Sequence, residues 1–240
     1  MIHLAENTIG EVVASNFHTA QVFTKYGIDF CCKGGISIAE VCANKGISVE
    51  ILLRDLESSK KSDITPNYQA MDAKSLIEHI VSIHHRYVLD TIPILNTYLE
   101  KIAKVHGKNH PELLDIRMLF EQCNDSLQLH IQKEERFLFP YIVTMQKLKE
   151  SGKYLTPPHF VNIENPIKMM EMEHEAEGTR MGLISKISNN YTLPADACQT
   201  YQTVFLMLKE FEQDLHIHIH IENNILFPMA KEMFELLYID

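Results

Sequence analysis

Two segments of this 240-residue chain, 88 residues apart, carry nearly the same motif. Residues 130–140 read HIQKEERFLFP, and residues 218–228 read HIHIENNILFP. In each copy a histidine precedes a glutamate by four residues, a spacing that places both side chains on one face of an α-helix. The proline that closes each copy is expected to bend or end its helix. A chain built on this repeat is expected to contain a duplicated pair of helices.

Four long stretches around the two motifs show the 3.6-residue period of amphipathic helices. Short breaks rich in Gly, Pro and Asn separate these stretches. The four stretches run over residues 71–105, 111–149, 165–188 and 194–236. Helices of this length with short connections pack as an antiparallel bundle. The sequence therefore predicts an all-α protein whose larger part is an antiparallel four-helix bundle.

Each of the four helices carries polar residues in the middle of its apolar, inward-facing stripe. His85 on the first helix and His174 on the third are 89 residues apart, so the third helix repeats the first. A buried glutamate costs several kcal/mol unless it is paired or bound to a metal. Imidazole suits zinc, iron, copper or nickel, and a carboxylate can bridge two cations. The residues that we predict to hold a pair of cations in the core are His85, His130, Glu134, His174, His218 and Glu222.

Other polar residues lie close to this predicted site. His84 is the rival ligand on the first helix, although the 89-residue offset favours His85. Glu177 also falls in the inward stripe of the third helix, where it would support a ligand or alter one coordination position. His216 and His220 lie on the side of their helix nearly opposite the repeated histidine. We expect these two to be exposed or to flank the core.

A small helical domain is predicted over residues 1–57, followed by a polar linker at 58–70 and the bundle at 71–240. A glycine-flanked loop in the small domain contains the adjacent cysteines Cys31 and Cys32. The lysine that follows them is expected to lower a thiol pKa, and the glycines allow access. We interpret the pair as a functional redox or metal-transfer site, with two core thiols as the alternative.

The composition excludes several classes of protein. A formal net charge of −10 argues against a nucleic-acid partner, which requires a basic face. No apolar run approaches the ~20 residues of a membrane span, and no secretory leader begins the chain, so no membrane association is expected. Five cysteines, an odd number without framework spacing, favour a reduced, cytoplasmic protein.

The motifs together resemble a known family. The two repeated motifs and the Glu173-His174 pair are similar to the hemerythrin-like domain of the iron-sulfur cluster repair proteins. The segment IDFCCKGG at residues 28–35 is similar to the short N-terminal domain of that family, so the resemblance covers essentially the whole chain. It implies two non-haem iron ions with an oxo or hydroxo bridge, held by the six core residues, with Glu134 and Glu222 as bridging ligands.

The resemblance also implies a function, the repair of iron-sulfur clusters damaged by nitric oxide or oxidative stress. Iron donation is the expected route, with reduction of nitric oxide as a related activity, so the sequence leaves open whether the protein is an enzyme. Damaged iron-sulfur proteins are the expected partners, and nitric oxide or dioxygen the expected small ligands. The alternatives are a hemerythrin-type sensor or carrier without catalysis and a structural zinc bundle. A homodimer formed through the small domain also stays open.

Overall fold

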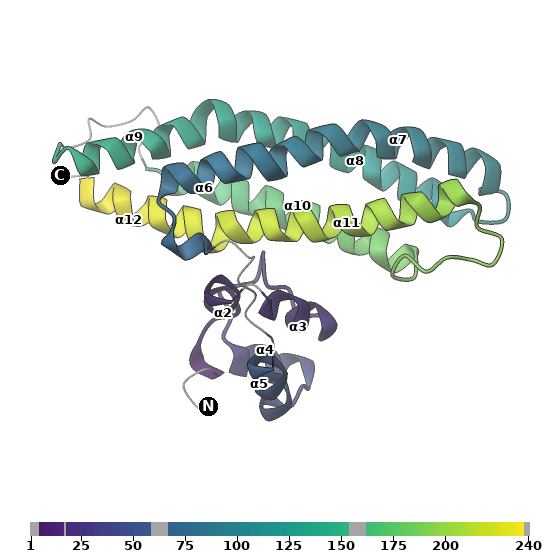
Figure 1. The fold of residues 1–240 in the computed structure, drawn as a ribbon, viewed down its shortest axis with the longest axis horizontal. Helices are drawn as coiled ribbons and strands as arrows, with labels where there is room; N and C mark the ends of the chain where they lie inside the picture. The colour runs from purple at the N-terminus through teal and green to yellow at the C-terminus, as the bar shows by residue number, and fades with distance from the viewer. Residues whose placement is uncertain (1–4, 17, 59–66, 154–161, 238–240) are drawn as a thin grey trace. The chain divides into compact units, whose positions relative to one another are not determined.

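The computed structural model describes residues 5–16, 18–58, 67–153 and 162–237 (Figure 1). Among these residues the regular structure is helical, and extended backbone pairs only at one isolated bridge in the N-terminal part. The prediction of an all-α protein is confirmed. Within the same ranges, no helix combines the length and the apolar character that crossing a membrane requires.

The chain divides into two compact units, each assembled from segments that are distant in the sequence. The first unit consists of Met1–Ile77, Val143–Ile163 and Ile217–Asp240, and the second of Glu78–Ile142 and Glu164–His216. Residues 59–66, which make up most of the predicted linker, lie outside the described residues.

The second unit is a four-helix bundle, in which each helix buries one apolar stripe. In Figure 1 its long helices lie side by side and alternate in direction. The helices are α7 (Arg86–His106), α8 (Glu112–Lys133), α10 (Glu164–Ile187) and the part of α11 (Gln199–Ile221) up to His216. The predicted antiparallel four-helix bundle is confirmed.

Among the described residues, three π-helical segments interrupt the long helices: η2 (Ile80–His85), η3 (Glu134–Leu138) and η4 (Glu222–Leu226). A π-helical turn closes its hydrogen bonds over one more residue than an α-helical turn, so the side chains that follow are rotated around the helix. An inward stripe continued from His130 and Glu134 at α-helical spacing predicts a buried Phe137, and this prediction is wrong, because Phe137 is 68% exposed and Leu138 is buried at 3%. A stripe drawn at 3.6 residues assumes α-helical geometry throughout and cannot anticipate this rotation.

The helices continue after the two π-helical segments that begin at the repeated glutamates. The continuations are α9 (Phe139–Glu150) and α12 (Phe227–Leu237), in which Pro140 and Pro228 are the second residues. The expectation that these prolines could end their helices is therefore wrong. Because the hydrogen-bond ladder already departs from the α pattern just before each proline, the missing N–H is accommodated.

Short helices form the N-terminal part of the first unit, as predicted. Thr8, Ser37 and Ser48 each cap a helix, because the side-chain oxygen accepts a backbone N–H three residues further on. Gly46 ends one of the helices in the left-handed conformation, at φ 66°. The elements are α2 (Ile9–Ser15), α3 (Thr19–Lys25), α4 (Ile38–Lys45), α5 (Val49–Glu57), η1 (Tyr68–Ala70) and α6 (Ala73–His79).

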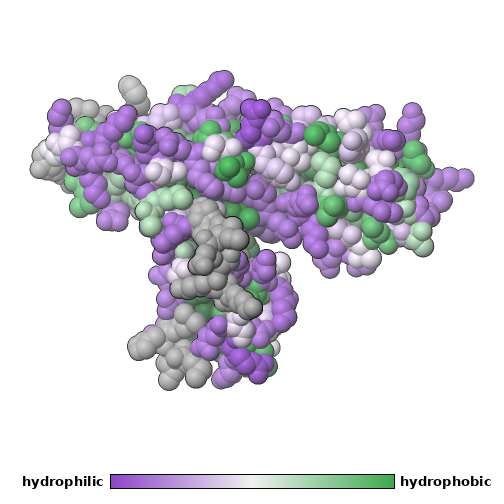
Figure 2. All heavy atoms as spheres, in the orientation of Figure 1, coloured by the Kyte–Doolittle hydropathy of each residue, from purple (hydrophilic) through white to green (hydrophobic). Residues whose placement is uncertain are grey.

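The molecular surface is mainly hydrophilic on the face shown in Figure 2, and hydrophobic side chains occur there singly or in small groups. Large apolar residues of the bundle that reach the surface include Leu89 and Ile94 on α7. Scattered exposed apolar residues are usual on proteins and indicate no particular partner.

Candidate metal centre

Four of the predicted ligands lie in the core of the second unit. η2 ends at His85, α8 carries His130, η3 begins at Glu134, and α10 carries His174. All four side chains are buried. Their inward orientation, predicted from the apolar stripes, is confirmed.

The carboxylate of Glu134 lies between two imidazoles. Its Oε2 is 3.3 Å from Nε2 of His85, and its Oε1 is 3.3 Å from Nε2 of His130. The Nε2 atoms of His130 and His174 are 3.0 Å apart. Each carboxylate oxygen thus faces a different histidine, which is the arrangement of a carboxylate that bridges two cations.

These separations fit donor atoms that share a cation. Metal–nitrogen and metal–oxygen bonds of about 2.1 Å place neighbouring donors about 3.0 Å apart at a right angle and about 3.4 Å apart at the tetrahedral angle. The distances from Glu134 to His85 and His130 fall within that range, as does the distance between His130 and His174. The buried group therefore has the chemistry and the spacing of a cation site.

Two further carboxylates orient these histidines from the opposite ring nitrogen. Nδ1 of His85 lies 2.8 Å from Glu135, and Nδ1 of His130 lies 2.9 Å from Glu173. Because an ionised carboxylate can only accept, the Nδ1–H groups donate, and each Nε2 is the ring nitrogen that faces Glu134. A cation shared by each Nε2 and the facing carboxylate oxygen would make these contacts favourable.

Glu173 is itself held in its ionised form. The hydrogen bond with His130, and then the ion pair with Lys133, lower the pKa of Glu173 below its ordinary value. The carboxylate can therefore fix the orientation of His130 while its own charge is balanced by Lys133. The sequence motif gives only one hint of this role, the position of Glu173 directly before His174.

His84 occupies a different environment from His85. Its Nδ1 lies 2.9 Å from Oδ1 of Asp214, and its ring packs edge-on against His79 at 5.4 Å between centroids. His85 is the member of the pair that contacts Glu134. The geometry therefore favours His85 as the ligand that η2 supplies.

Glu177 is buried one turn beyond His174, as its place in the stripe predicts. It forms an ion pair with Arg180, three residues further along α10. Burial and the neighbouring Glu177 raise the pKa of the Cys123 thiol well above its ordinary value. Arg180 thus compensates the charge of Glu177, and the i, i+3 spacing of the two residues was a signal available in the sequence.

In the first unit, His218 and Glu222 form a second buried histidine–glutamate pair. His218 lies near the end of α11, and η4 begins at Glu222. Nε2 of His218 is 3.1 Å from Oε1 of Glu222. Both copies of the repeat therefore place the histidine against the glutamate one turn later, at the start of a π-helical segment.

His220 contradicts the sequence prediction, because it is fully buried rather than exposed or flanking. Its Nδ1 is 3.1 Å from the Asn224 side chain, and its ring meets Phe30 edge-on at 5.8 Å. Burial lowers the pKa of His220 to about 4. A residue almost 200 positions earlier covers this face of α11, and no helical pattern within α11 could reveal that. His216 is half-buried, consistent with a flanking position.

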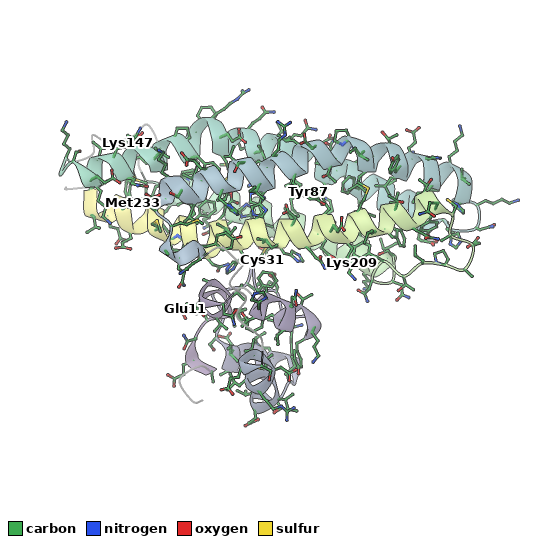
Figure 3. The ribbon with its side chains drawn as sticks, in the orientation of Figure 1. Glu11, Cys31, Tyr87, Lys147, Lys209 and Met233 are labelled. Carbon is green, nitrogen blue, oxygen red and sulfur yellow. The ribbon has the colours of Figure 1, made fainter. Side chains whose placement is uncertain are left out.

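The loop with the two adjacent cysteines also belongs to the first unit. The Asn224 side chain donates hydrogen bonds to the carbonyl oxygens of Phe30, at 3.4 Å, and Cys31, at 3.1 Å. Cys31, labelled in Figure 3, is buried, and Cys32 is half-exposed. The hydrogen bond with Cys32, then burial, raise the pKa of the Cys31 thiol. The expectation of a lowered pKa is therefore wrong for Cys31.

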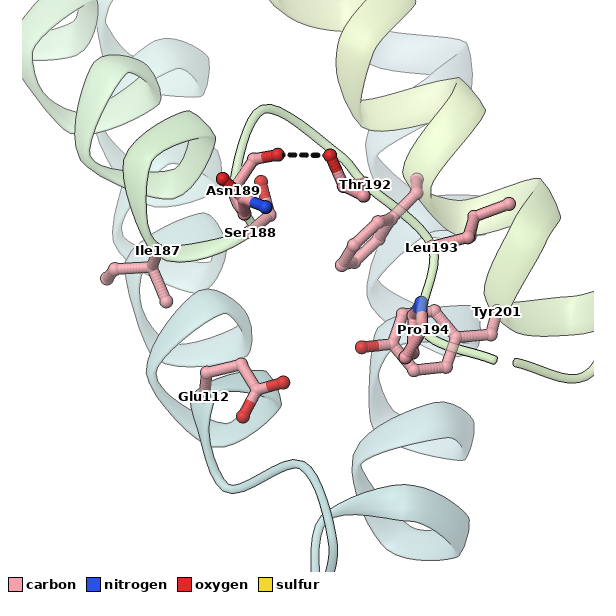
Figure 4. Close-up of a pocket in the computed structure, with 9 residues that line it drawn as sticks. Glu112, Ile187, Ser188, Asn189, Thr192, Leu193, Pro194 and Tyr201 are labelled. Carbon is pink, nitrogen blue, oxygen red and sulfur yellow. Dashed lines mark hydrogen bonds between the residues drawn. The ribbon is translucent and has the colours of Figure 1, made fainter. Parts of the chain in front are cut away.

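A pocket opens in the second unit, where α8 begins and the segment between α10 and α11 turns (Figure 4). Its lining includes Glu112, Leu193 and Tyr201, and the side chain of Thr192 donates a hydrogen bond to the Asn189 carbonyl at 2.5 Å. The residues that line it include none of the predicted ligands. The pocket is therefore distinct from the candidate metal centre.

Comparison with known families agrees with the buried histidines and glutamates. A family model described as "Hemerythrin HHE cation binding domain" matches residues 76–230, more than half of the chain. The chain belongs to the hemerythrin HHE family. A second model, described as a domain of unknown function (DUF542), matches residues 5–60 of this hemerythrin-type chain. The resemblance identified from the sequence motifs is confirmed.

Similar proteins carry a common name. The iron-sulfur cluster repair protein ScdA of Staphylococcus haemolyticus is 32% identical over 223 residues, which cover 92% of this chain and 96% of that protein. ScdA of Staphylococcus epidermidis is 31% identical over 229 residues, covering 94% and 98%. The iron-sulfur cluster repair protein YtfE of Shigella boydii is 28% identical over 225 residues, covering 94% and 96%. The similarity extends over both the hemerythrin-type part and the N-terminal part.

Proposed function

We propose that this protein repairs iron-sulfur clusters damaged by nitric oxide or oxidative stress, and that it uses a buried non-haem di-iron centre. The observation that supports this most directly is Glu134, whose two oxygens face the imidazoles of His85 and His130. The name shared by the similar proteins supplies the biological process.

The proposed centre uses six residues from both copies of the repeat: His85, His130, Glu134, His174, His218 and Glu222. Glu134 and Glu222 are the proposed bridging ligands, and the histidines the terminal ones. The buried His218–Glu222 pair supports this assignment, because it has the spacing of the first copy. The donor set of imidazoles and carboxylates, without a thiolate, suits iron.

The iron pair would supply redox chemistry between ferrous and ferric states and an open position for a small ligand, with an oxo or hydroxo group between the ions. The protein residues have separate tasks. Glu135 and Glu173 hold the Nδ1 protons of His85 and His130, which keeps each Nε2 available. Burial of the donor groups keeps bulk solvent away from them, so the ligands expected to reach them are small molecules such as nitric oxide or dioxygen.

We favour donation of iron to the damaged cluster as the repair step, with nitric oxide reduction as a related activity. In donation, iron is the cargo and damaged iron-sulfur proteins are the partners. Cys31 and Cys32 form the proposed redox or metal-transfer site, on a loop that Asn224 holds to η4. The net charge of −10 supports a partner other than a nucleic acid. We also propose a cytoplasmic location, where damaged iron-sulfur proteins would be repaired.

The proposed division of the chain into a small domain at 1–57, a linker at 58–70 and a bundle domain at 71–240 is supported by the family matches. One match ends at residue 60 and the other begins at residue 76. This division is based on continuous stretches of sequence that match known families. The two compact units are defined instead by which segments pack together, so their boundaries differ. Whether the small domain also forms a homodimer is to be measured on the intact protein.

The proposed function is tested by removing both bridging carboxylates in the variant Glu134→Leu/Glu222→Leu. Cells that carry it should lose recovery of an iron-sulfur enzyme after nitric oxide exposure, and the purified variant should lose its iron. Glu121→Leu is the matched control, because Glu121 lies on α8 with an exposed side chain. Full recovery in cells carrying the iron-free variant would refute the proposal. Reversible oxygen binding with stable spectra, and no repair by the wild type, would select the carrier instead.

A further inference from the structure

Three donor atoms meet in the N-terminal loop, away from the histidine and glutamate groups. Asp29, Cys31 and Cys32 each direct one ligand atom into a group whose members lie within 4.8 Å of one another. Sγ of Cys31 is 3.2 Å from Oδ1 of Asp29 and 3.7 Å from Sγ of Cys32. The group therefore brings two sulfurs and one carboxylate within 4.8 Å of one another.

The separations match those that one cation imposes on its ligands. Bonds of about 2.3 Å to sulfur and about 2.0 Å to oxygen give an S···S distance of about 3.8 Å and an S···O distance of about 3.5 Å at the tetrahedral angle. At a right angle the same bonds give about 3.3 Å and about 3.0 Å. The S···S distance between Cys31 and Cys32, 3.7 Å, lies within the first range. The S···O distance between Cys31 and Asp29, 3.2 Å, lies within the second.

Backbone hydrogen bonds hold the three donors in place. The carboxylate of Asp29 accepts the N–H of Cys31 at 3.0 Å and the N–H of Cys32 at 2.9 Å, which folds the loop around its Oδ1. Asn224 fixes the outer side of the loop through the carbonyls of Phe30 and Cys31. Little rearrangement is needed before a cation binds.

The close packing of this loop depends on Gly34. A Cβ atom at Gly34 would lie 2.8 Å from the carbonyl oxygen of Phe30 and would also meet the Asn224 side chain. Only a glycine therefore lets the loop approach Asn224. Since Asn224 belongs to η4, which begins at Glu222, the loop is tied to the segment that carries a proposed bridging ligand.

The site is closed on one side and open on the other. Cys31 is buried, whereas Cys32 is half-exposed and Asp29 is exposed. Three protein donors leave a fourth position that a donor from another molecule can occupy. Structural sites use four protein ligands, so an open three-donor site is better suited to exchange of the cation.

We propose that Asp29, Cys31 and Cys32 bind one thiophilic divalent cation, with ferrous iron as the cargo and zinc or cobalt as competent substitutes. The inference rests on the metal-transfer role proposed above for the two cysteines. Binding forms two metal–sulfur bonds and one metal–oxygen bond, and each thiol releases its proton to the solvent. No electron transfer is involved, and the cation stays divalent.

The experiment is a titration of the metal-free, full-length protein with cobalt(II), followed in the near ultraviolet. A cobalt–thiolate bond gives a sulfur-to-cobalt charge-transfer band, which imidazole and carboxylate ligands do not produce. We expect the band to reach the intensity of one thiolate-bound cobalt per chain, beyond any cobalt that the histidine and glutamate residues take up, and to disappear in Cys31→Ser/Cys32→Ser. Cys198→Ser is the matched control, because Cys198 is an exposed cysteine elsewhere, and it should leave the band unchanged.

Asp29→Asn separates binding from folding. Asparagine keeps an oxygen that can accept the two backbone N–H groups but loses the charge, so the band should form with affinity weaker on the order of tenfold. A band that survives in Cys31→Ser/Cys32→Ser, or unchanged affinity in Asp29→Asn, would overturn the inference. Zinc should bleach the cobalt band, and failure to compete would overturn it as well.

The two proposals fail in different ways. In Glu134→Leu/Glu222→Leu the charge-transfer band should remain, because its ligands lie in the loop. Cobalt binding in the loop together with normal repair in that variant would refute the di-iron function alone. Normal repair by wild type without a cobalt–thiolate band would refute the loop site alone.

Discussion

The ion pair of Glu177 and Arg180 gives the sharpest prediction about the bundle. Replacing Arg180 with Met should strongly destabilise the protein, because the carboxylate of Glu177 stays in the core without the cation that balances it. Replacing both residues with Met should restore most of the loss. An apolar pair of similar volume removes the buried charge instead of leaving it uncompensated.

The expected magnitude follows from the burial of the two side chains. Breaking a buried ion pair by removing one partner costs about 3–5 kcal/mol. The side chain of Glu177 is 5% exposed and that of Arg180 is 20% exposed, so water reaches the pair from one side and the lower value applies. For a chain of this length, a loss of about 3 kcal/mol lowers the melting temperature by roughly 6–12 °C.

The assay is urea and thermal unfolding of the metal-free proteins, followed by circular dichroism. Arg117→Met is the matched control, because Arg117 pairs with Glu121 on the surface of α8 and should cost less than about 1 kcal/mol. A cost for Arg180→Met no larger than for Arg117→Met would refute the reasoning. So would a double variant no more stable than Arg180→Met alone.

Three further predictions concern other parts of the molecule. Glu173→Gln should weaken metal binding about 10–100-fold by releasing the ring of His130, which chelator competition measures, and unchanged affinity would contradict this. Asn224→Ala should speed amide hydrogen exchange in residues 28–36. Exchange rates equal to those of the wild type would show that the loop keeps its conformation without Asn224. Burial raises the pKa of Tyr201 from 10.0 to about 12, so stability is lost as pH rises through that interval. In unfolding experiments, Tyr201→Phe should lose less stability between pH 10 and pH 12 than the wild type does. If the free energy of unfolding falls equally with pH in both proteins, Tyr201 is not the source of the loss.

The helices could be predicted because their determinants are local. Thr8, Ser37 and Ser48 cap helices within three residues of themselves, and the apolar stripes identify the inward faces of His130 and His174. Such features depend on short-range geometry that the sequence states directly. For the same reason the fold class and the candidate ligands could be proposed before the structure.

The remaining features depend on contacts between distant segments or on irregular backbone. The burial of His220 requires Phe30 and Asn224, and Asp29 joins the cysteine site only because the loop folds back on its carboxylate. The rotation that exposes Phe137 depends on a π-helical turn. A reading of one helix at a time contains none of this information.

The π-helical segments also determine how the proposed metal-binding motif could be moved to another protein. Grafting only the histidine and the glutamate onto a regular helix would keep their one-turn spacing and lose the rotation that follows η3 or η4. On a regular helix, Leu138 would then face solvent and Phe137 would face the core, which is the reverse of their exposure in this structure. A graft would therefore need the whole eleven-residue segment, 130–140 or 218–228, including its proline. The π-helical backbone is as much a part of the motif as the two side chains.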